Sequence, residues 1–187
     1  LGAAGLAVAG TMINSGSLTG DAPVTLNSGA SVTNQAAGLI GGGLSGDVTA
    51  SGASVVNAGS IVGSIGINLF ASGVVTNQAN AVISGDVGVL FNEASTVINA
   101  GLIRCVAESG AGVLMQGGTV TNLSGGTISA TIGIYASGPA TIINAGLIEG
   151  TIAPGIDLAE GSVTNQSGGT ITGGYRAISA YNASTLV

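Results

Sequence analysis

The residues of this chain that could do acid-base chemistry are few. Two basic and eight acidic residues occur among 187, His is absent, and the net charge is −6. Arg104, Glu108, Glu149, Asp157 and Glu160 form the one charged group of the kind that polysaccharide-cleaving enzymes use in a groove. We expect any local binding site in the long turn after Arg104, which carries Glu108, with Glu149 beside it. The competing interpretation is an ordinary solvated loop, because long loops vary freely.

Several function classes are excluded by residues that the chain lacks. Without His there is no Ser-His-Asp or Cys-His arrangement, and zinc loses its usual nitrogen ligand. Without Lys there is no Walker-type phosphate loop, and two Arg cannot form a nucleic-acid footprint. The stretch 41–47 is weakly similar to a calcium-binding glycine/aspartate repeat. That motif works by tandem repetition, and here it recurs only in part, at 84–86, so we interpret both stretches as turns. We expect no cofactor, no metal and no nucleic-acid partner.

An asparagine recurs along the whole chain at intervals of 20 to 23 residues. A side-chain amide at a corner can bond both the backbone of its own turn and the same amide one repeat away. We therefore predict a structural asparagine ladder rather than a chemical site. Its members are Asn14, Asn34, Asn57, Asn77, Asn99, Asn122, Asn144 and Asn165.

The elements that must position these residues are short strands. Each repeat has three segments with period-2 aliphatic residues, separated by turns that contain glycine, which is typical of strands joined by tight corners. The pattern predicts an all-β solenoid, a parallel β-helix of about eight coils of ~22 residues with three short strands per coil. In the third strand we expect an aliphatic column that includes Val48, and an inward column formed by Leu26, Ala50, Leu69, Phe91, Met115, Ala136, Leu158 and Ala180. Cys105 falls in a small-residue column, where we expect a packed, inert thiol.

The repeats also alternate in pairs. Asn14, Asn57, Asn99 and Asn144 have short turns and follow Ile or Val, whereas the other four have turns two residues longer and follow Thr. The residue before each asparagine should point outward, and so should Leu39, Val82, Leu102 and Leu147. The outer surface is then apolar and nearly uncharged, which predicts association with a partner, including a second copy of the chain. Arg104 and Glu149 should share one outward column two coils apart, about 10 Å.

The repeats resemble those of a known protein family. Residues 163–174 (VTNQSGGTITGG) and 142–150 (IINAGLIEG) resemble the passenger regions of bacterial autotransporter adhesins and, more loosely, filamentous-haemagglutinin-type repeats. The resemblance implies a right-handed β-helix, secretion through the outer membrane, and roles in adhesion, aggregation or biofilm. Because residues 185–187 match the start of a ninth repeat, we expect residues 1–187 to be a single β-helix segment cut from a longer array.

These observations together predict a non-enzymatic structural or adhesive stalk at the bacterial outer cell surface or outside the cell. Self-association through the apolar lateral surface or the coil ends is expected, with a receptor or glycan on a host or neighbouring cell as a possible partner. No direct membrane insertion of this segment is expected, since no unbroken apolar stretch of about 18 residues occurs. The alternatives are a self-assembling extracellular filament or surface-layer subunit and, from another class, a polysaccharide-active β-helix enzyme.

Overall fold

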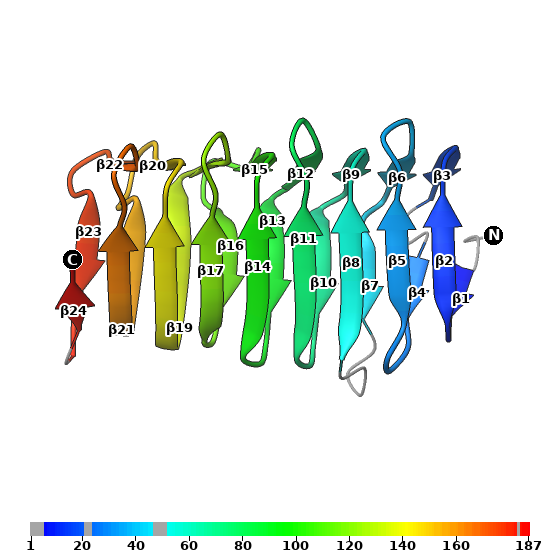
Figure 1. Ribbon diagram of the computed structural model, residues 1–187, viewed down its shortest axis with the longest axis horizontal. Helices are drawn as coiled ribbons and strands as arrows, with labels where there is room; N and C mark the ends of the chain where they lie inside the picture. The colour runs from blue at the N-terminus through cyan, green and yellow to red at the C-terminus, as the bar shows by residue number, and fades with distance from the viewer. Residues whose placement is uncertain (1–5, 21–23, 47–51, 183) are drawn as a thin grey trace.

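The chain winds into a β-solenoid of about eight turns, with successive coils stacked side by side along one axis (Figure 1). The computed structural model describes residues 6–20, 24–46, 52–182 and 184–187. All regular elements among them are strands, and every strand pairing is parallel. None of these residues belongs to a helix long and apolar enough to cross a membrane. The predicted all-β parallel β-helix with three strands per coil is confirmed.

The strands fall into three rows, one strand of each row per coil. Row A, which ends at the asparagines, contains β2 (Thr11–Asn14), β5 (Ser31–Asn34), β8 (Ala53–Asn57), β11 (Gly73–Asn77), β14 (Ser95–Asn99), β17 (Gly118–Asn122), the second halves of β19 (Ile132–Asn144) and β21 (Ile156–Asn165), and β24 (Thr185–Leu186). Row B contains β3 (Ser17–Thr19), β6 (Leu39–Gly41), β9 (Ser60–Val62), β12 (Val82–Gly85), β15 (Leu102–Cys105), β18 (Thr127–Ala130), β20 (Leu147–Gly150) and β22 (Thr170–Gly173). Row C contains β1 (Leu6–Val8), β4 (Val24–Leu26), β7 (Leu44–Gly46), β10 (Ile65–Leu69), β13 (Val87–Phe91), β16 (Ala111–Met115), the first halves of β19 and β21, and β23 (Ile178–Ala180).

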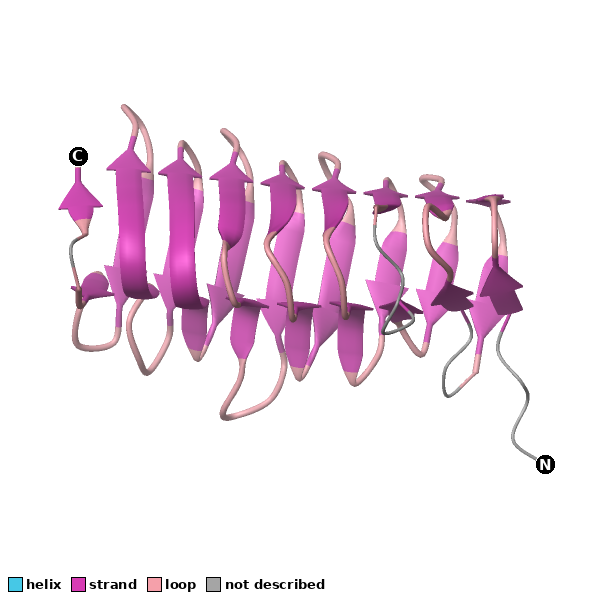
Figure 2. Cartoon of the chain, turned by 90° about the horizontal axis from the view of Figure 1, so that it is seen from below, coloured by secondary structure: helices cyan, strands magenta, loops and turns pink. Residues whose placement is uncertain are grey.

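Rows A and C form one sheet of 16 strands, and row B forms a separate sheet of eight. The two rows of the larger sheet are continuous because β19 and β21 run from row C into row A without a break. Figure 2, from below, shows the strands of successive coils aligned in these rows with turns along their edges. Within each row, equivalent residues of successive coils therefore lie directly beside one another.

The core consists of stacked aliphatic columns, one or two per row. Row B contributes buried isoleucines at 40, 61, 83, 103, 128 and 148, each in register with the next. Row A contributes a buried column of valine and isoleucine, and row C adds Leu26, Leu69, Phe91, Met115, Ala136 and Leu158. A single coil cannot enclose such a column, so its burial depends on the coils on both sides.

One part of the predicted row C columns is wrong. The strand after Gly43 pairs Leu44 with both Val24 and Ile67, and Gly46 pairs with Leu26. These two residues therefore occupy the column positions that were predicted for Val48 and Ala50, which lie outside the described residues. The cause is a tight turn in which Gly42 and Gly43 both adopt positive φ, 103° and 84°. That turn brings row C forward by four residues.

The alternation of the coils appears in the turns between rows A and B. In Figure 1 the loops above β5, β11 and β17 stand taller than those above β8 and β14. On row A the outward residues before the asparagines alternate in register between aliphatic and Thr, as predicted. Most are half-buried by their neighbours, while Ile13 is 64% exposed.

Candidate functional site

The eight repeated asparagines form a continuous hydrogen-bonded chain along the A/B corner. In every coil the side-chain Nδ2 donates to Oδ1 of the asparagine in the next coil, at 2.8–2.9 Å, from Asn14 through to Asn165. The six central amides are fully buried. The predicted bonding of each amide to the next is therefore present at all seven steps.

The same amides also bond the backbone of their turns. Asn99 Nδ2 reaches the carbonyl oxygen of Gly101 in its own turn and that of Thr127 in the next coil, both at 3.1 Å. In the short turns the amide oxygen additionally accepts from the backbone N–H two residues on, for example from Gly101 at 3.3 Å. The longer turns replace this bond with a backbone turn, such as Ala81 N–H to Gln78 O at 3.1 Å. A buried amide with all these partners carries no spare capacity for a ligand, so the ladder is structural.

Arg104 and Glu149 do share one outward column of row B, with Ser129 between them. Their side chains are engaged separately. Arg104 Nε donates to Ser84 Oγ at 3.3 Å, and Glu149 Oε2 accepts from Ser129 Oγ at 2.8 Å. No ion pair joins the two residues. Two coil spacings, about 10 Å, separate their backbone positions along this column.

Glu108 lies exposed in the turn between β15 and β16, where its backbone carbonyl oxygen accepts from Thr131 Oγ1 at 2.9 Å. Cys105 is half-buried and unpaired, and its thiol donates to the carbonyl oxygen of Asp86 at 2.9 Å. Asp157 and Glu160 belong to β21 in the larger sheet. The five charged residues thus lie on β15, the turn after it, β20 and β21, and no ion pair links any of these described side chains.

A hollow of about 340 Å³ is formed in part by the long turn, but not by its charged side chains. Its walls include Ser109, Leu114, Ile132 and Tyr135, and none of Arg104, Glu108 or Glu149 is among its lining residues. Mostly apolar walls suit burial of an apolar group better than acid-base chemistry. Within the described ranges, no group of three or more His, Cys, Asp or Glu side chains is placed to hold a metal ion.

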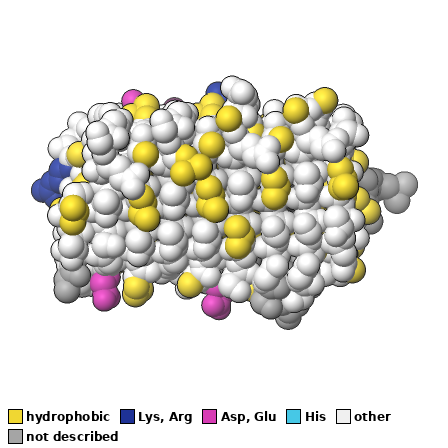
Figure 3. Space-filling view, in the orientation of Figure 1, with side chains coloured by type: hydrophobic (Ala, Val, Ile, Leu, Met, Phe, Trp, Pro, Cys, Tyr) yellow, Lys and Arg dark blue, Asp and Glu magenta, His cyan; other side chains and the backbone are white. Residues whose placement is uncertain are grey.

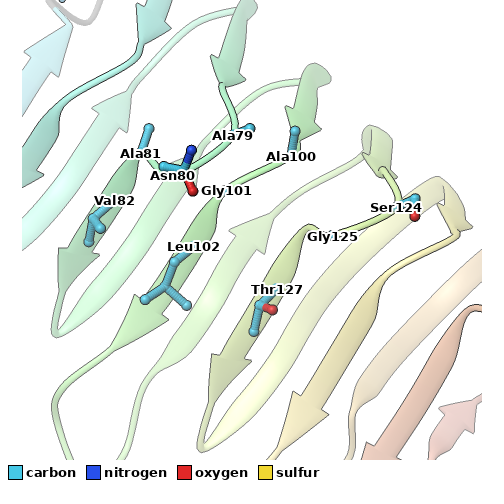
Figure 4. Close-up of a pocket in the computed structure, with 10 residues that line it drawn as sticks. All are labelled: Ala79, Asn80, Ala81, Val82, Ala100, Gly101, Leu102, Ser124, Gly125 and Thr127. Atoms are coloured by element: carbon cyan, nitrogen blue, oxygen red, sulfur yellow. The ribbon is translucent and has the colours of Figure 1, made fainter. Parts of the chain in front are cut away.

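The alternating turns create two further hollows along the A/B corner. One of about 530 Å³ lies between the long turns 78–81 and 123–126, above the short turn at Ala100 (Figure 4). Val82, Leu102 and Thr127 line it from successive strands of row B. A second, of about 320 Å³, repeats the arrangement two coils further on, above Ala145. Neither hollow is lined by a charged side chain, so both offer shape and small apolar or hydroxyl groups only.

The outer face formed by row A is nearly free of charge. Figure 3 shows charged side chains only near the margins of this face, and hydrophobic side chains as separate spots divided by other atoms. Because Thr alternates with aliphatic residues in register, the apolar surface is periodic rather than continuous.

Sequence reasoning missed the aromatic side chains. All three tyrosines are at least 36% exposed, at positions 135, 175 and 181. Tyr135 and Tyr181 flank Asp157 in a small hollow on row C. A search for outward aromatic residues in the row C segments would have found this group.

Comparison of the chain with known protein families, with curated proteins and with solved structures finds no significant match.

Proposed function

We propose that this chain is a non-enzymatic structural and adhesive stalk of a bacterial cell-surface or secreted protein, which supports adhesion or self-association through its lateral surface. Its place outside the bacterial cell is supported by the resemblance of repeats such as 142–150 to autotransporter passengers. The observation that carries the proposal is the long face of row A, where aliphatic and Thr side chains alternate coil by coil with almost no charge.

The stacking of the coils supports the stalk part of the proposal. Each coil bonds to the next through three strand rows and through the asparagine ladder, with no interruption from Asn14 to Asn165. About eight coils at a strand spacing of ~4.8 Å give a rod of roughly 38 Å. A rod held by so many parallel bonds resists bending and keeps any attached group at a fixed distance.

The row A face supports the adhesive part. Uncharged surface is desolvated at low cost, and periodic ridges of Ile98, Ile143 and their equivalents can interdigitate with a matching surface. A second copy of this chain has the same two-coil period. Its aliphatic side chains can therefore pack over the smaller Thr side chains of the first copy. The separate hydrogen-bonding of Arg104 and Glu149 favours a role without catalysis.

Lysine substitutions on this face test the proposal. Val56, Ile98 and Ile143 are half-buried outward residues of alternate coils, and replacing all three with Lys places positive charges along the face. We expect concentration-dependent self-association of the unmodified chain in sedimentation velocity, and an association constant at least about tenfold lower in the triple variant, because buried charges without partners are costly.

A matched control carries the same added charge elsewhere. Lysines at Gln78, Ser124 and Gln166, which are exposed in the long turns, should leave association unchanged. Equal association of both triple variants and the unmodified chain, or a chain that stays monomeric at millimolar concentration, would overturn self-association through row A. Turnover of a glycan that is lost on Arg104→Ala or Glu149→Ala would overturn the non-enzymatic assignment.

A further inference from the structure

Two tyrosines and a carboxylate lie together on the outer side of row C. Tyr135 of β19, Asp157 of β21 and Ser179 of β23 occupy one register column in three successive coils. Tyr181 follows β23, and its backbone N–H donates to the carbonyl oxygen of Leu158 at 3.0 Å. The solenoid thus brings residues from three coils, 46 positions apart in sequence, to one surface point.

These residues enclose a hollow of about 210 Å³ that Tyr135, Ala136, Asp157, Ala159 and Tyr181 line. Because residue 159 is alanine, space remains open between the side chains of Tyr135 and Tyr181. Tyr135 is 36% exposed and Tyr181 63% exposed, so both rings are accessible to a ligand. The hydroxyl of buried Ser179 bonds the Tyr181 hydroxyl at 3.3 Å, which helps to hold that ring in place.

The Asp157 carboxylate has no hydrogen-bond or ion-pair partner among the described residues, although it is half-buried. Burial raises its pKa above the ordinary value. An unpaired carboxylate in a partly dry hollow is costly, and a cation that enters the hollow offsets that cost.

The spacing of the two tyrosines suits a cation between them. They lie two coils apart and two residues apart along the strand, which at ~4.8 Å per coil and ~3.3 Å per residue separates their backbones by roughly 12 Å. A group centred above Asp157 and Ala159 therefore lies roughly midway between the two tyrosine backbones, with one tyrosine side chain on each side of it.

We propose that this hollow binds a methylated or quaternary ammonium group, with Asp157 supplying the counter-charge and Tyr135 and Tyr181 supplying the ring faces. Methyl groups make such a cation weakly hydrated, so it enters an aromatic hollow more readily than an unmodified ammonium. The chain already contains one contact of this type, since the Arg176 guanidinium lies 5.7 Å from the centroid of the Tyr175 ring. This site is independent of the proposed stalk function.

Choline and its neutral isostere 3,3-dimethylbutan-1-ol are the probes. The two molecules have the same shape, so a difference between them reports the charge alone. Because the chain has three tyrosines and no Trp, tyrosine fluorescence together with NMR chemical shifts follows binding. We expect saturable binding of choline and at least about tenfold weaker binding of the isostere, as expected for cation–π attraction plus a counter-charge.

Variants locate the site. Asp157→Asn and Tyr181→Ala should each weaken choline binding at least about fivefold. The matched controls are Glu160→Gln, which removes a carboxylate on the same strand, and Tyr175→Ala, which removes an exposed tyrosine outside the hollow; both should bind like the unmodified chain. Asp157→Asn should fold, because a raised pKa means that the folded chain penalises the charged carboxylate rather than depending on it.

A trimethyl-lysine tripeptide and phosphatidylcholine vesicles distinguish the sources of the group. Tighter binding of the tripeptide assigns a methylated side chain, and tighter binding of the vesicles assigns a lipid headgroup. Equal binding of choline and its isostere, binding of neutral monosaccharides in place of choline, or choline binding that survives Asp157→Asn and Tyr181→Ala would overturn the proposal.

Discussion

At the scale of single residues, the asparagine ladder holds the A/B corner by satisfying groups that water cannot reach. Each central amide is fully buried, and its oxygen and nitrogen both bond side chains in neighbouring coils. The benefit of such a bond is modest, whereas the cost of leaving its partner unpaired is large. The effect of removing one amide should therefore depend on burial.

Asn99→Ala tests this dependence. The substitution leaves Oδ1 of Asn122 without its 2.8 Å donor and takes from Nδ2 of Asn77 its 2.9 Å acceptor. With about 1–3 kcal/mol for each buried group affected, we expect a loss of about 2–5 kcal/mol in the free energy of unfolding, measured in urea. Asn165→Ala is the matched control, because Asn165 is exposed and water can replace its bonds. Its loss should stay below about 1 kcal/mol. Equal losses of stability in the two variants would contradict the expected dependence on burial.

At the scale of the turn, the short corners require glycine because coils approach closely there. A Cβ on Gly101 would overlap the carbonyl oxygens of Gln78 and Ala81 in the preceding coil. Gly16 occupies the same turn position after Asn14, but nothing in the described chain lies within 4 Å of a Cβ built there. The requirement therefore comes from stacking and not from the backbone conformation of the turn.

The pair Gly101→Ala and Gly16→Ala tests this explanation. We expect Gly101→Ala to lower the free energy of unfolding by about 1–3 kcal/mol, as overpacking does. Gly16→Ala should be neutral or slightly stabilising, because alanine restricts the unfolded chain. Thermal and urea denaturation of both variants measure the difference. A large loss in Gly16→Ala would instead indicate that the turn itself requires glycine.

Most strands could be predicted from sequence, because period-2 aliphatic residues and the asparagine mark two of the three rows in every coil. Row C is less regular, since its distance from row B depends on the intervening turn. The Gly42–Gly43 turn is short because two positive φ angles reverse the chain within two residues, and spacing alone does not reveal that geometry. Leu44 therefore holds a position that was predicted for Val48.

The candidate site was harder to predict than the fold. The shared column of Arg104 and Glu149 follows from the repeat, yet their bonding to Ser84 and Ser129 depends on side-chain conformations that the repeat does not specify. Tyr135 and Tyr181 come together only because the coil spacing converts 46 residues of sequence into two steps along the axis.

At the scale of the whole molecule, stability is shared between neighbouring coils. Every core column continues through successive coils, and central members such as Ile103 are fully buried while Leu18 and Ile171 near the two ends are only partly buried. In a solenoid of this kind the free energy is a sum of coil terms and nearest-neighbour contacts. A defect at the centre weakens contacts on two sides, whereas a defect at an end weakens them on one.

Ile103→Ala and Ile171→Ala, followed by hydrogen exchange, test this sharing. In the unmodified chain we expect the slowest exchange in β11 to β20 and faster exchange toward both ends. Ile103→Ala creates a buried cavity and should cost about 2–5 kcal/mol, with faster exchange in the coils on both sides. Ile171→Ala should cost less and accelerate exchange only in β20 to β24, the strand that pairs with β22 and those that follow. Acceleration confined to the coil of Ile103 would show that the coils fold independently, which their incomplete individual cores argue against.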